Sequence, residues 1–164
     1  MGIEIGKYCR FYGKMKFCRF PHSLIRISDH CGFRSSYASN LIGINHPCII
    51  ATHRENAEII IGKGCGFSGT VIGAFSSVKL GNNVRCGANT TITDADWHLD
   101  DPRSGKPTPI VIEDNVWLGL NAIVLKGVII GRNSVIGAGS VVTKNIPPNV
   151  IAAGNPCKVI KSIE

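Results

Sequence analysis

The residues with the clearest potential for chemistry are His98 and the two carboxylates that precede it, Asp94 and Asp96. An imidazole can remove a proton from a hydroxyl near neutral pH. A carboxylate beside it could fix its tautomer and stabilise the imidazolium that forms. The same residue types also occur on solvated surfaces. The pattern therefore predicts acid–base chemistry only if the fold holds His98 in a defined position.

The segment that carries His98 interrupts a regular pattern of apolar residues. That pattern runs up to Ile92 and resumes at Ile112, and residues 94–109 lie between the two. The segment holds three prolines and many polar residues, which a continuous sheet would not accommodate. We expect residues 94–109 to leave the wall of the fold as a protruding loop, with His98 near its root.

The regular pattern is a six-residue repeat. Every sixth position in one register is aliphatic: Ile112, Leu118, Val124, Ile130, Ile136 and Val142. Four residues after each lies a second column of small or branched residues: Val116, Ala122, Val128, Ser134, Ser140 and Ile146. A period of six fits neither a helix nor simple strand alternation. It predicts a chain that runs straight, turns a corner and repeats, so that three straight segments make one 18-residue coil of a triangular prism.

The rest of the chain is arranged around this repeat. Gly, Asn and Asp at the expected corners, as in Asp114-Asn115, supply the turn conformations that other residues resist. Residues 34–58 are expected as a second irregular stretch, with His46 and His53 on a loop surface. Residues 147–164 lose the sixfold step and should cap the open end of the solenoid. The whole chain, residues 1–164, is then one all-β domain.

Composition excludes several classes of protein. No apolar run approaches the ~18 residues of a membrane span, and the first residues lack the organisation of a signal peptide. We therefore expect a soluble, cytoplasmic protein without a membrane span. The seven cysteines form no C-x-x-C pair, so no metal site is expected, and Cys31, Cys48 and Cys65 are expected as small buried residues stacked from coil to coil.

The net charge of +7 also needs an explanation. Lysines and arginines are spread along the chain without a basic stripe interleaved with aromatics, so no nucleic-acid partner is expected. A phosphate-bearing cofactor or an acidic glycan accounts for the charge more economically.

Three further sequence segments follow the His98 loop: residues 115–119 (NVWLG), 134–144 (SVIGAGSVVTK) and 146–160 (IPPNVIAAGNPCKVI). With them the chain resembles the hexapeptide-repeat acyltransferases, which fold as a left-handed parallel β-helix. It is most similar to the sugar O-acetyltransferases, the galactoside, maltose and surface-polysaccharide enzymes. The resemblance is most specific from Ile92 to Glu164, whereas upstream of about Ile59 only the repeat matches.

The resemblance implies direct transfer of an acetyl group from acetyl-CoA to a sugar hydroxyl, on a bacterial cell-surface glycan or its precursor. His98 would be the general base, and Asp96 is the first candidate for the carboxylate that orients it. The backbone amide of Leu120 would face the oxyanion, and Trp117 would wall the acyl site.

The resemblance also implies residues that contact the cofactor and the acceptor. The resemblance places further cofactor contacts on Ala138, Thr143, Lys144, Lys158 and Lys161. Ser68 and Asp94 would contact the acceptor; Ser68 stands where the galactoside enzymes have an asparagine, which puts a small galactoside acceptor in doubt. Family enzymes are homotrimers with each active site between two prisms. His98 and the cofactor residues are therefore expected to come from different chains.

Three other functions are known for this fold or fit its residues: a zinc enzyme, a scaffold subunit and an N-acetyltransferase. A zinc carbonic anhydrase of the same fold needs three histidines around the metal, two of them as a His-x4-His pair, and the five histidines here include no such pair. A non-catalytic scaffold subunit would leave the His98 loop unexplained. N-acetylation of an amino-sugar nucleotide is the strongest alternative, because an amine acceptor also needs its proton removed.

Overall fold

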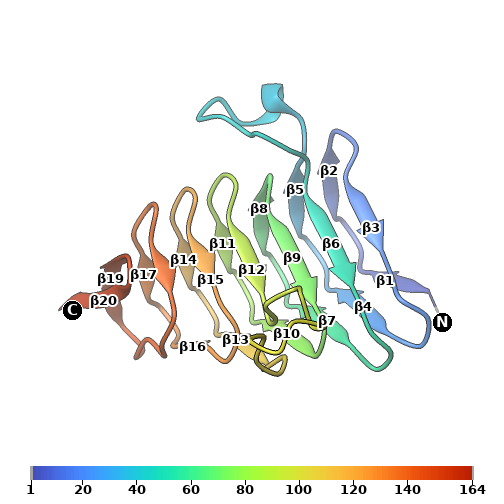
Figure 1. The fold of residues 1–164 in the computed structure, drawn as a ribbon. Coiled ribbons are helices and arrows are strands. Elements are labelled where there is room, and N and C mark those ends of the chain that lie inside the picture. The colour runs from blue at the N-terminus through green and yellow to red at the C-terminus, as the bar shows by residue number, and fades with distance from the viewer. Residues whose placement is uncertain (1, 164) are drawn as a thin grey trace.

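The chain folds as an all-β solenoid whose coils stack along one axis (Figure 1). The computed structural model describes residues 2–163. Within them are twenty short strands and one 3-10 helix, η1 (Tyr37–Ser39). No helix in this range is long and apolar enough to cross a membrane.

Each coil passes through three sheets in turn. Sheet A consists of β1 (Ile3–Ile5), β4 (Leu24–Ile27), β7 (Glu58–Ile61), β10 (Ser77–Leu80), β13 (Ile110–Ile112) and β16 (Ile129–Ile130). Sheet B consists of β2 (Arg10–Tyr12), β5 (Gly32–Arg34), β8 (Gly66–Ser68), β11 (Arg85–Cys86), β14 (Trp117–Leu118), β17 (Val135–Ile136), β19 (Val150–Gly154) and β20 (Cys157–Ser162). Sheet C consists of β3 (Lys16–Cys18), β6 (Ile49–Thr52), β9 (Val71–Ala74), β12 (Thr91–Thr93), β15 (Ile123–Val124) and β18 (Val141–Val142).

Strand pairing confirms the predicted 18-residue coil in the downstream half. Ile112 pairs in parallel with Ile130, as do the equivalent residues of sheets B and C. All six members of the predicted aliphatic column have no exposed surface, and the second column is at most 4% exposed. Three parallel sheets around an apolar interior fit the predicted parallel β-helix.

The corners between sheets A and B carry a ladder of asparagines. Asn83, Asn115, Asn133 and Asn149 all adopt positive φ, near 60°, a conformation that asparagine tolerates better than most residues. The side-chain amide of each of the first three donates to the next asparagine, at 3.3, 3.1 and 2.8 Å. This ladder links the corners of the downstream coils, and it confirms the predicted role of asparagine at these turns.

The upstream interior is filled partly by aromatic rings and thiols. Phe33 stacks on Phe67 with ring centroids 4.9 Å apart. Cys31 and Cys65 are buried next to one another, one residue before the paired Gly32 and Gly66, so their predicted stacking is confirmed. Cys48 is also buried but precedes a strand of sheet C, so it belongs to a different column.

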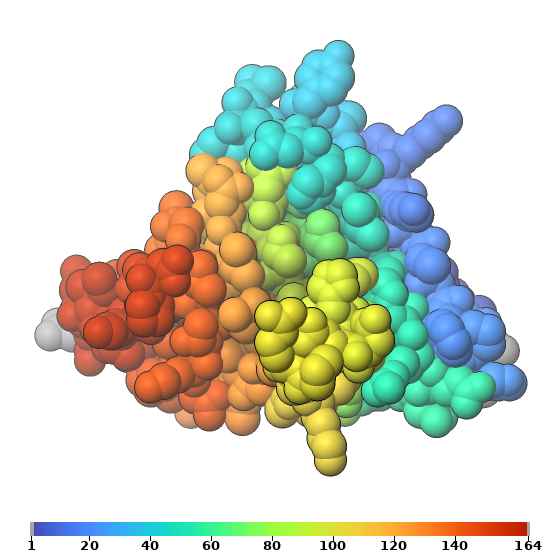
Figure 2. Space-filling model, in the orientation of Figure 1, coloured from blue at the N-terminus to red at the C-terminus, as the bar shows by residue number. Residues whose placement is uncertain are grey.

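Two insertions interrupt the coils. Residues 94–109 connect β12 to β13 at the corner between sheets C and A, and residues 35–48, with η1, connect β5 to β6 at the corner between B and C. In Figure 2 the first insertion forms a yellow mound that stands out from the surface. The prediction of an irregular stretch over residues 34–58 is wrong beyond residue 48, because β6 pairs in register with β3 and β9.

The C-terminal end of the solenoid differs from the repeated coils. Strand β19 continues sheet B in parallel beside β17, and β20 turns back antiparallel on β19. This hairpin supplies the last two strands of sheet B.

Candidate active site

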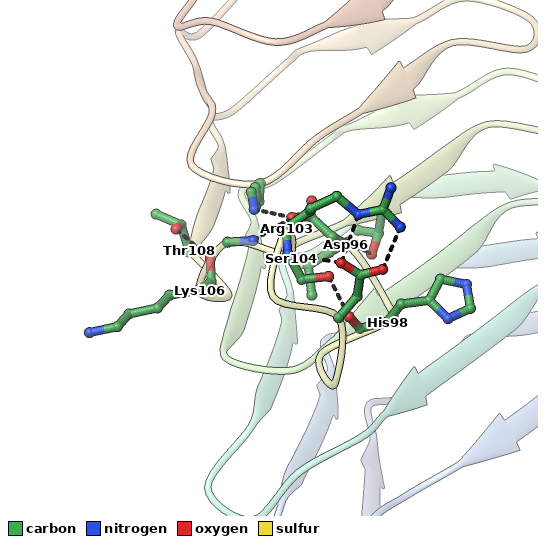
Figure 3. Close-up of polar contacts among 11 residues, drawn as sticks. Asp96, His98, Arg103, Ser104, Lys106 and Thr108 are labelled. Atoms are coloured by element: carbon green, nitrogen blue, oxygen red, sulfur yellow. Dashed lines mark hydrogen bonds and ion pairs between the residues drawn. The ribbon is translucent and has the colours of Figure 1, made fainter.

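His98 lies on the 94–109 loop with its side chain exposed. Its amide donates to the Asp96 carbonyl at 2.8 Å, and its carbonyl accepts from the Asp101 amide at 3.0 Å and from the Ser104 hydroxyl. Figure 3 shows the imidazole pointing away from the labelled loop residues, and no interaction line reaches the ring. The backbone of His98 is therefore fixed while its ring remains available to a ligand.

Asp94 anchors the start of this loop from inside the wall. Its side chain has no exposed surface. The carboxylate accepts three backbone N–H bonds, from Phe75 at 2.7 Å, Ser76 at 2.7 Å and Ser77 at 2.8 Å. These bonds tie the loop to the turn between β9 and β10. Asp94 thus holds a turn and is sealed from solvent, contrary to the predicted contact with the acceptor.

Asp96 fixes the far side of the loop. Its carboxylate forms an ion pair with Lys126 and accepts the Gly105 amide at 2.8 Å. The Lys126 ammonium, helped by the Gly105 N–H, lowers the pKa of Asp96 below its usual value. The structure therefore pairs Asp96 with Lys126 and not with the ring of His98, contrary to the predicted orienting role.

An aromatic cluster that the sequence analysis did not recognise packs at the root of the loop. It consists of His53, Phe75 and Trp97, with ring centroids 4.5 to 5.4 Å apart. The Trp97 indole N–H donates to the Thr93 hydroxyl at 2.7 Å. Gly73 leaves room for the indole, because a Cβ there would lie 2.8 Å from it.

His53 is the unusual member of this cluster. It was expected on a loop surface, but its Nε2 is buried and has no hydrogen-bond partner within residues 2–163. Burial lowers its pKa, and the nearby charge of Asp94 acts weakly in the opposite direction. His53 and Phe75 each directly follow paired strands of sheet C, and this register is visible only in the structure.

The outer face of sheet B gathers a second group of predicted site residues. Trp117, 52% exposed, pairs with Val135, which pairs with Ile151, and Ile151 faces Lys161 across the final hairpin. Lys158 lies on the same strand, β20, and both lysines are exposed. These residues form one continuous surface along the downstream coils.

The other predicted cofactor residues lie at corners. Leu120 and Ala138 occupy equivalent positions between sheets B and C, where the Gly139 amide bonds the Leu120 carbonyl at 2.7 Å. The amide N–H groups of Leu120 and Ala138 have no acceptor in the part of the chain that the structure describes. Thr143 and Lys144 are exposed and follow β18 at the corner between sheets C and A.

Most of the predicted site residues therefore fall into two separated groups, and Leu120 and Ala138 lie at the corner between sheets B and C. His98, Thr143 and Lys144 occupy the corner between sheets C and A. Trp117 and the β20 lysines occupy sheet B, which is the face opposite that corner in a three-sided prism. One copy of the chain does not bring the two groups together.

Ser68 lies on the outer face of sheet B, upstream of Trp117. It is 7% exposed, and its hydroxyl accepts a hydrogen bond from the Asn40 side chain at 3.1 Å. It also lines a hollow of about 500 Å³ that extends to Trp117. The position is compatible with the predicted acceptor contact.

Comparisons with known proteins identify what this architecture is similar to. Residues 109–144 match the family described as hexapeptide repeat of succinyl-transferase. Galactoside O-acetyltransferase of Escherichia coli K12 is 43% identical over 121 residues, which are 71% of this chain and 59% of that protein. The chain spans about half the length of the curated relatives it matches.

Solved structures agree with the sequence relatives. A maltose O-acetyltransferase from Clostridium difficile 630 superposes with a TM-score of 0.60 at 30% identity, covering 98% of this chain and 70% of that one. A galactoside acetyltransferase in complex with coenzyme A superposes with a TM-score of 0.60 at 32% identity, covering 98% of this chain and 65% of that one.

Proposed function

Because the chain belongs to the hexapeptide-repeat acetyltransferases of the galactoside and maltose O-acetyltransferase group, we propose that it transfers an acetyl group from acetyl-CoA to a sugar hydroxyl. The observation that carries the proposal is the exposed ring of His98, whose backbone is fixed but whose nitrogens have no partner within residues 2–163. Such a ring can accept a proton from a bound hydroxyl.

The chemistry assigned to His98 is direct acyl transfer. His98 takes the proton of the acceptor hydroxyl while the hydroxyl oxygen attacks the thioester carbonyl carbon. The new C–O bond forms, the C–S bond breaks, and His98 returns the proton to the departing thiolate. The atoms balance with the acetyl ester and CoA thiol as products. The Leu120 N–H, which has no acceptor among residues 2–163, is assigned to the developing oxyanion.

The residues of the downstream coils fit a CoA thioester. CoA carries phosphate groups, and Lys158 and Lys161 are exposed cations on one strand that face solvent beside the Trp117 surface. The free Ala138 N–H offers a backbone donor to an amide of the pantetheine arm. Thr143 and Lys144 are assigned to the same ligand from the corner between sheets C and A.

The separation of the two groups supports an active site shared between two copies of the chain. His98 lies opposite sheet B within one prism, so only a neighbouring prism can present sheet B to it. We assign the assembly as a homotrimer, with each site formed by the His98 loop of one chain and the sheet B face of the next. Closed cyclic symmetry gives every chain the same two contacts.

The test follows CoA release from acetyl-CoA in the presence of sugars, oligosaccharides and nucleotide sugars. His98→Ala is expected to lower kcat by roughly 10²–10⁴, the usual contribution of a general base. CoA binding, measured by calorimetry, should be nearly unchanged because the ring is assigned to the acceptor. A matched control is His22→Ala, which removes an exposed imidazole from a turn far along the chain.

Each alternative has a distinct signature in the same assay. Full activity in His98→Ala would overturn the assigned mechanism. Turnover of amino-sugar nucleotides in preference to all hydroxyl acceptors would replace O-acetylation by N-acetylation. Failure of wild-type protein to bind CoA would favour a scaffold role.

A further inference from the structure

The upstream half of the outer face of sheet B contains a hollow whose arginines have no role in the transfer mechanism. We call it the arginine groove and define it by Arg10, Arg34, Arg85, Gly32, Gly66 and Trp117. Its volume is about 500 Å³. The two glycines form its floor, and a Cβ at either position would meet nothing within 4 Å. The groove is therefore open because side chains are missing from the middle of an otherwise side-chain-bearing surface.

Strand register makes the groove a straight track. Arg10, Gly32, Gly66, Arg85 and Trp117 occupy the same position on five neighbouring strands of sheet B. At the ~4.8 Å spacing of paired strands, the track runs for roughly 19 Å. It ends at Trp117, the residue assigned to the acyl site, so a ligand in the groove would lead directly to the reacting centre.

The groove is strongly and uniformly basic. Three arginines line it, and no acidic residue does so within residues 2–163. None of these arginines forms an ion pair in that range, although four ion pairs occur elsewhere. The guanidinium of Arg34 is nevertheless held in place, because it lies 4.7 Å from the centre of the Tyr12 ring and donates to the Ser39 carbonyl at 2.6 Å. Arginines without an ion-pair partner, one of them held in place, are suited to carboxylate and phosphate groups.

Aromatic rings line the same track. Tyr8 and His30 stack with centroids 5.0 Å apart beside the upstream end, Tyr12 lies under Arg34, and Trp117 closes the downstream end. Flat rings with a polar edge give apolar contact area at small entropic cost. A groove with such rings and unpaired arginines matches a ligand that has both flat, partly apolar faces and negative charges.

We infer that the arginine groove binds the acceptor and that the acceptor is an anionic saccharide, bearing carboxylate or phosphate groups on units beyond the one that is acetylated. The inference rests on the proposed function, because it places the reactive hydroxyl at Trp117. The arginines bind the charged units, and the rings pack against the sugar faces. The length of the track favours an oligomer over a single sugar.

The experiment compares acceptors that differ only in charge. Wild-type protein is assayed with neutral oligosaccharides, with the same oligosaccharides carrying uronic-acid carboxylates, and with phosphorylated forms. Arg34→Gln/Arg85→Gln is expected to raise KM for the charged acceptors about tenfold, with a small change in kcat and in CoA binding. Arg132→Gln is the control, since it removes an exposed arginine at the corner between sheets A and B. Direct binding of the charged oligosaccharides, followed by Trp fluorescence, gives a readout that does not need turnover.

The outcomes separate this inference from the proposed function. Preference for neutral acceptors, with KM unaffected by the double substitution, would overturn the groove assignment and leave the acetyl transfer standing. Arginine-dependent binding of charged oligosaccharides without any acetyl transfer would support the groove and overturn the proposed function. A groove that bound a single-stranded oligonucleotide or CoA in preference to every charged saccharide would also overturn the inference.

Discussion

The corner between sheets C and A and the outer face of sheet B lie on opposite sides of the same coils, and they present side chains by different means. At the corner the coil is interrupted, and single contacts hold the loop: the three amide bonds of Asp94, the Asp96–Lys126 pair and the aromatic cluster. On the face the coils are continuous, and register alone aligns Arg85 with Trp117. The contacts at the corner therefore fix the position of one loop, whereas the register on the face aligns residues along a straight line.

This comparison separates two kinds of functional effect. A buried residue at the corner, such as Asp94, acts on catalysis by holding the loop that carries His98, so its loss should affect kcat and folding together. A residue on the face projects from a strand that is stabilised by the buried residue beside it. Its loss should affect ligand binding and leave folding almost unchanged.

The largest expected effect comes from variants that carry the intact corner and the intact face on different chains. His98→Ala and Trp117→Ala are each expected to be nearly inactive alone. Co-expressed in equal amounts, they should form mixed trimers in which one site of every three, about a third, combines an intact His98 loop with an intact face. Activity of the mixed trimers should then rise from almost none to about a third of the wild-type value. CoA release measured on mixed trimers, purified through two affinity tags, checks this expectation.

The controls for complementation are the two single variants, assayed separately and after mixing without subunit exchange. No recovery in verified mixed trimers would mean that the corner and the face of one chain serve the same site. The separation of the two groups within one prism would then need another explanation.

Two neighbouring residues of β14, one buried and one exposed, are expected to differ in their effect on stability. Leu118 is fully buried in the aliphatic column, whereas Trp117 is 52% exposed. Leu118→Ala should lower the free energy of unfolding by about 2–5 kcal/mol, because it leaves a cavity between two stacked coils. Trp117→Ala should change it by less than about 1 kcal/mol and mainly impair turnover. Denaturant unfolding followed by circular dichroism measures both, and equal losses would show that the face is not independent of the core.

The sequence predicted the face much better than the corner, and the reason is physical. A sixfold repeat fixes which residues point inward, so the buried column, the 18-residue coil and the exposure of Trp117 all follow from spacing. The interruption at residues 94–109 was equally visible. Its internal contacts were not, because no local rule states that Asp94 turns inward or that Asp96 reaches Lys126, thirty residues away.

The same limit explains the two other differences between sequence and structure. The degraded repeat upstream concealed β6 within residues 34–58, since only strand pairing reveals its register. His53 was expected on a surface because its packing partners, Phe75 and Trp97, come from later coils. The only sequence feature that pointed to the arginine groove was the net charge of +7, and a net charge does not say where the basic residues lie on the surface.

At the corner, Asp94 gives the next largest expected effect. Asp94→Asn keeps the shape of the side chain but replaces one carboxylate oxygen by an N–H₂ group. Where this oxygen now accepts the N–H bonds of Ser76 and Ser77, donor would face donor. The free energy of unfolding should fall by about 2 kcal/mol, and kcat should fall as the loop loses its anchor. Asp96→Asn is the matched control, because it breaks an exposed ion pair and should leave the unfolding midpoint almost unchanged. Similar unfolding midpoints for the two variants would contradict the anchoring role of Asp94.

The smallest expected effect concerns His53. It measures how much the packing of the aromatic cluster at the corner contributes to the pH dependence of stability. Burial lowers the pKa of His53 in the folded chain, whereas the unfolded chain binds the proton with the ordinary pKa of about 6.5. Below that pH the unfolded state binds more protons, so folding stability is complete above about pH 6.5 and decreases as the pH falls toward the folded-state pKa. His53→Phe keeps a ring between Phe75 and Trp97 but cannot be protonated. It should remove this part of the pH dependence, on the order of 1–2 °C in Tm between pH 7 and pH 5.5. Thermal unfolding of both proteins across that range measures it, and parallel curves for wild type and variant would show that the aromatic cluster accepts a charged His53 without cost.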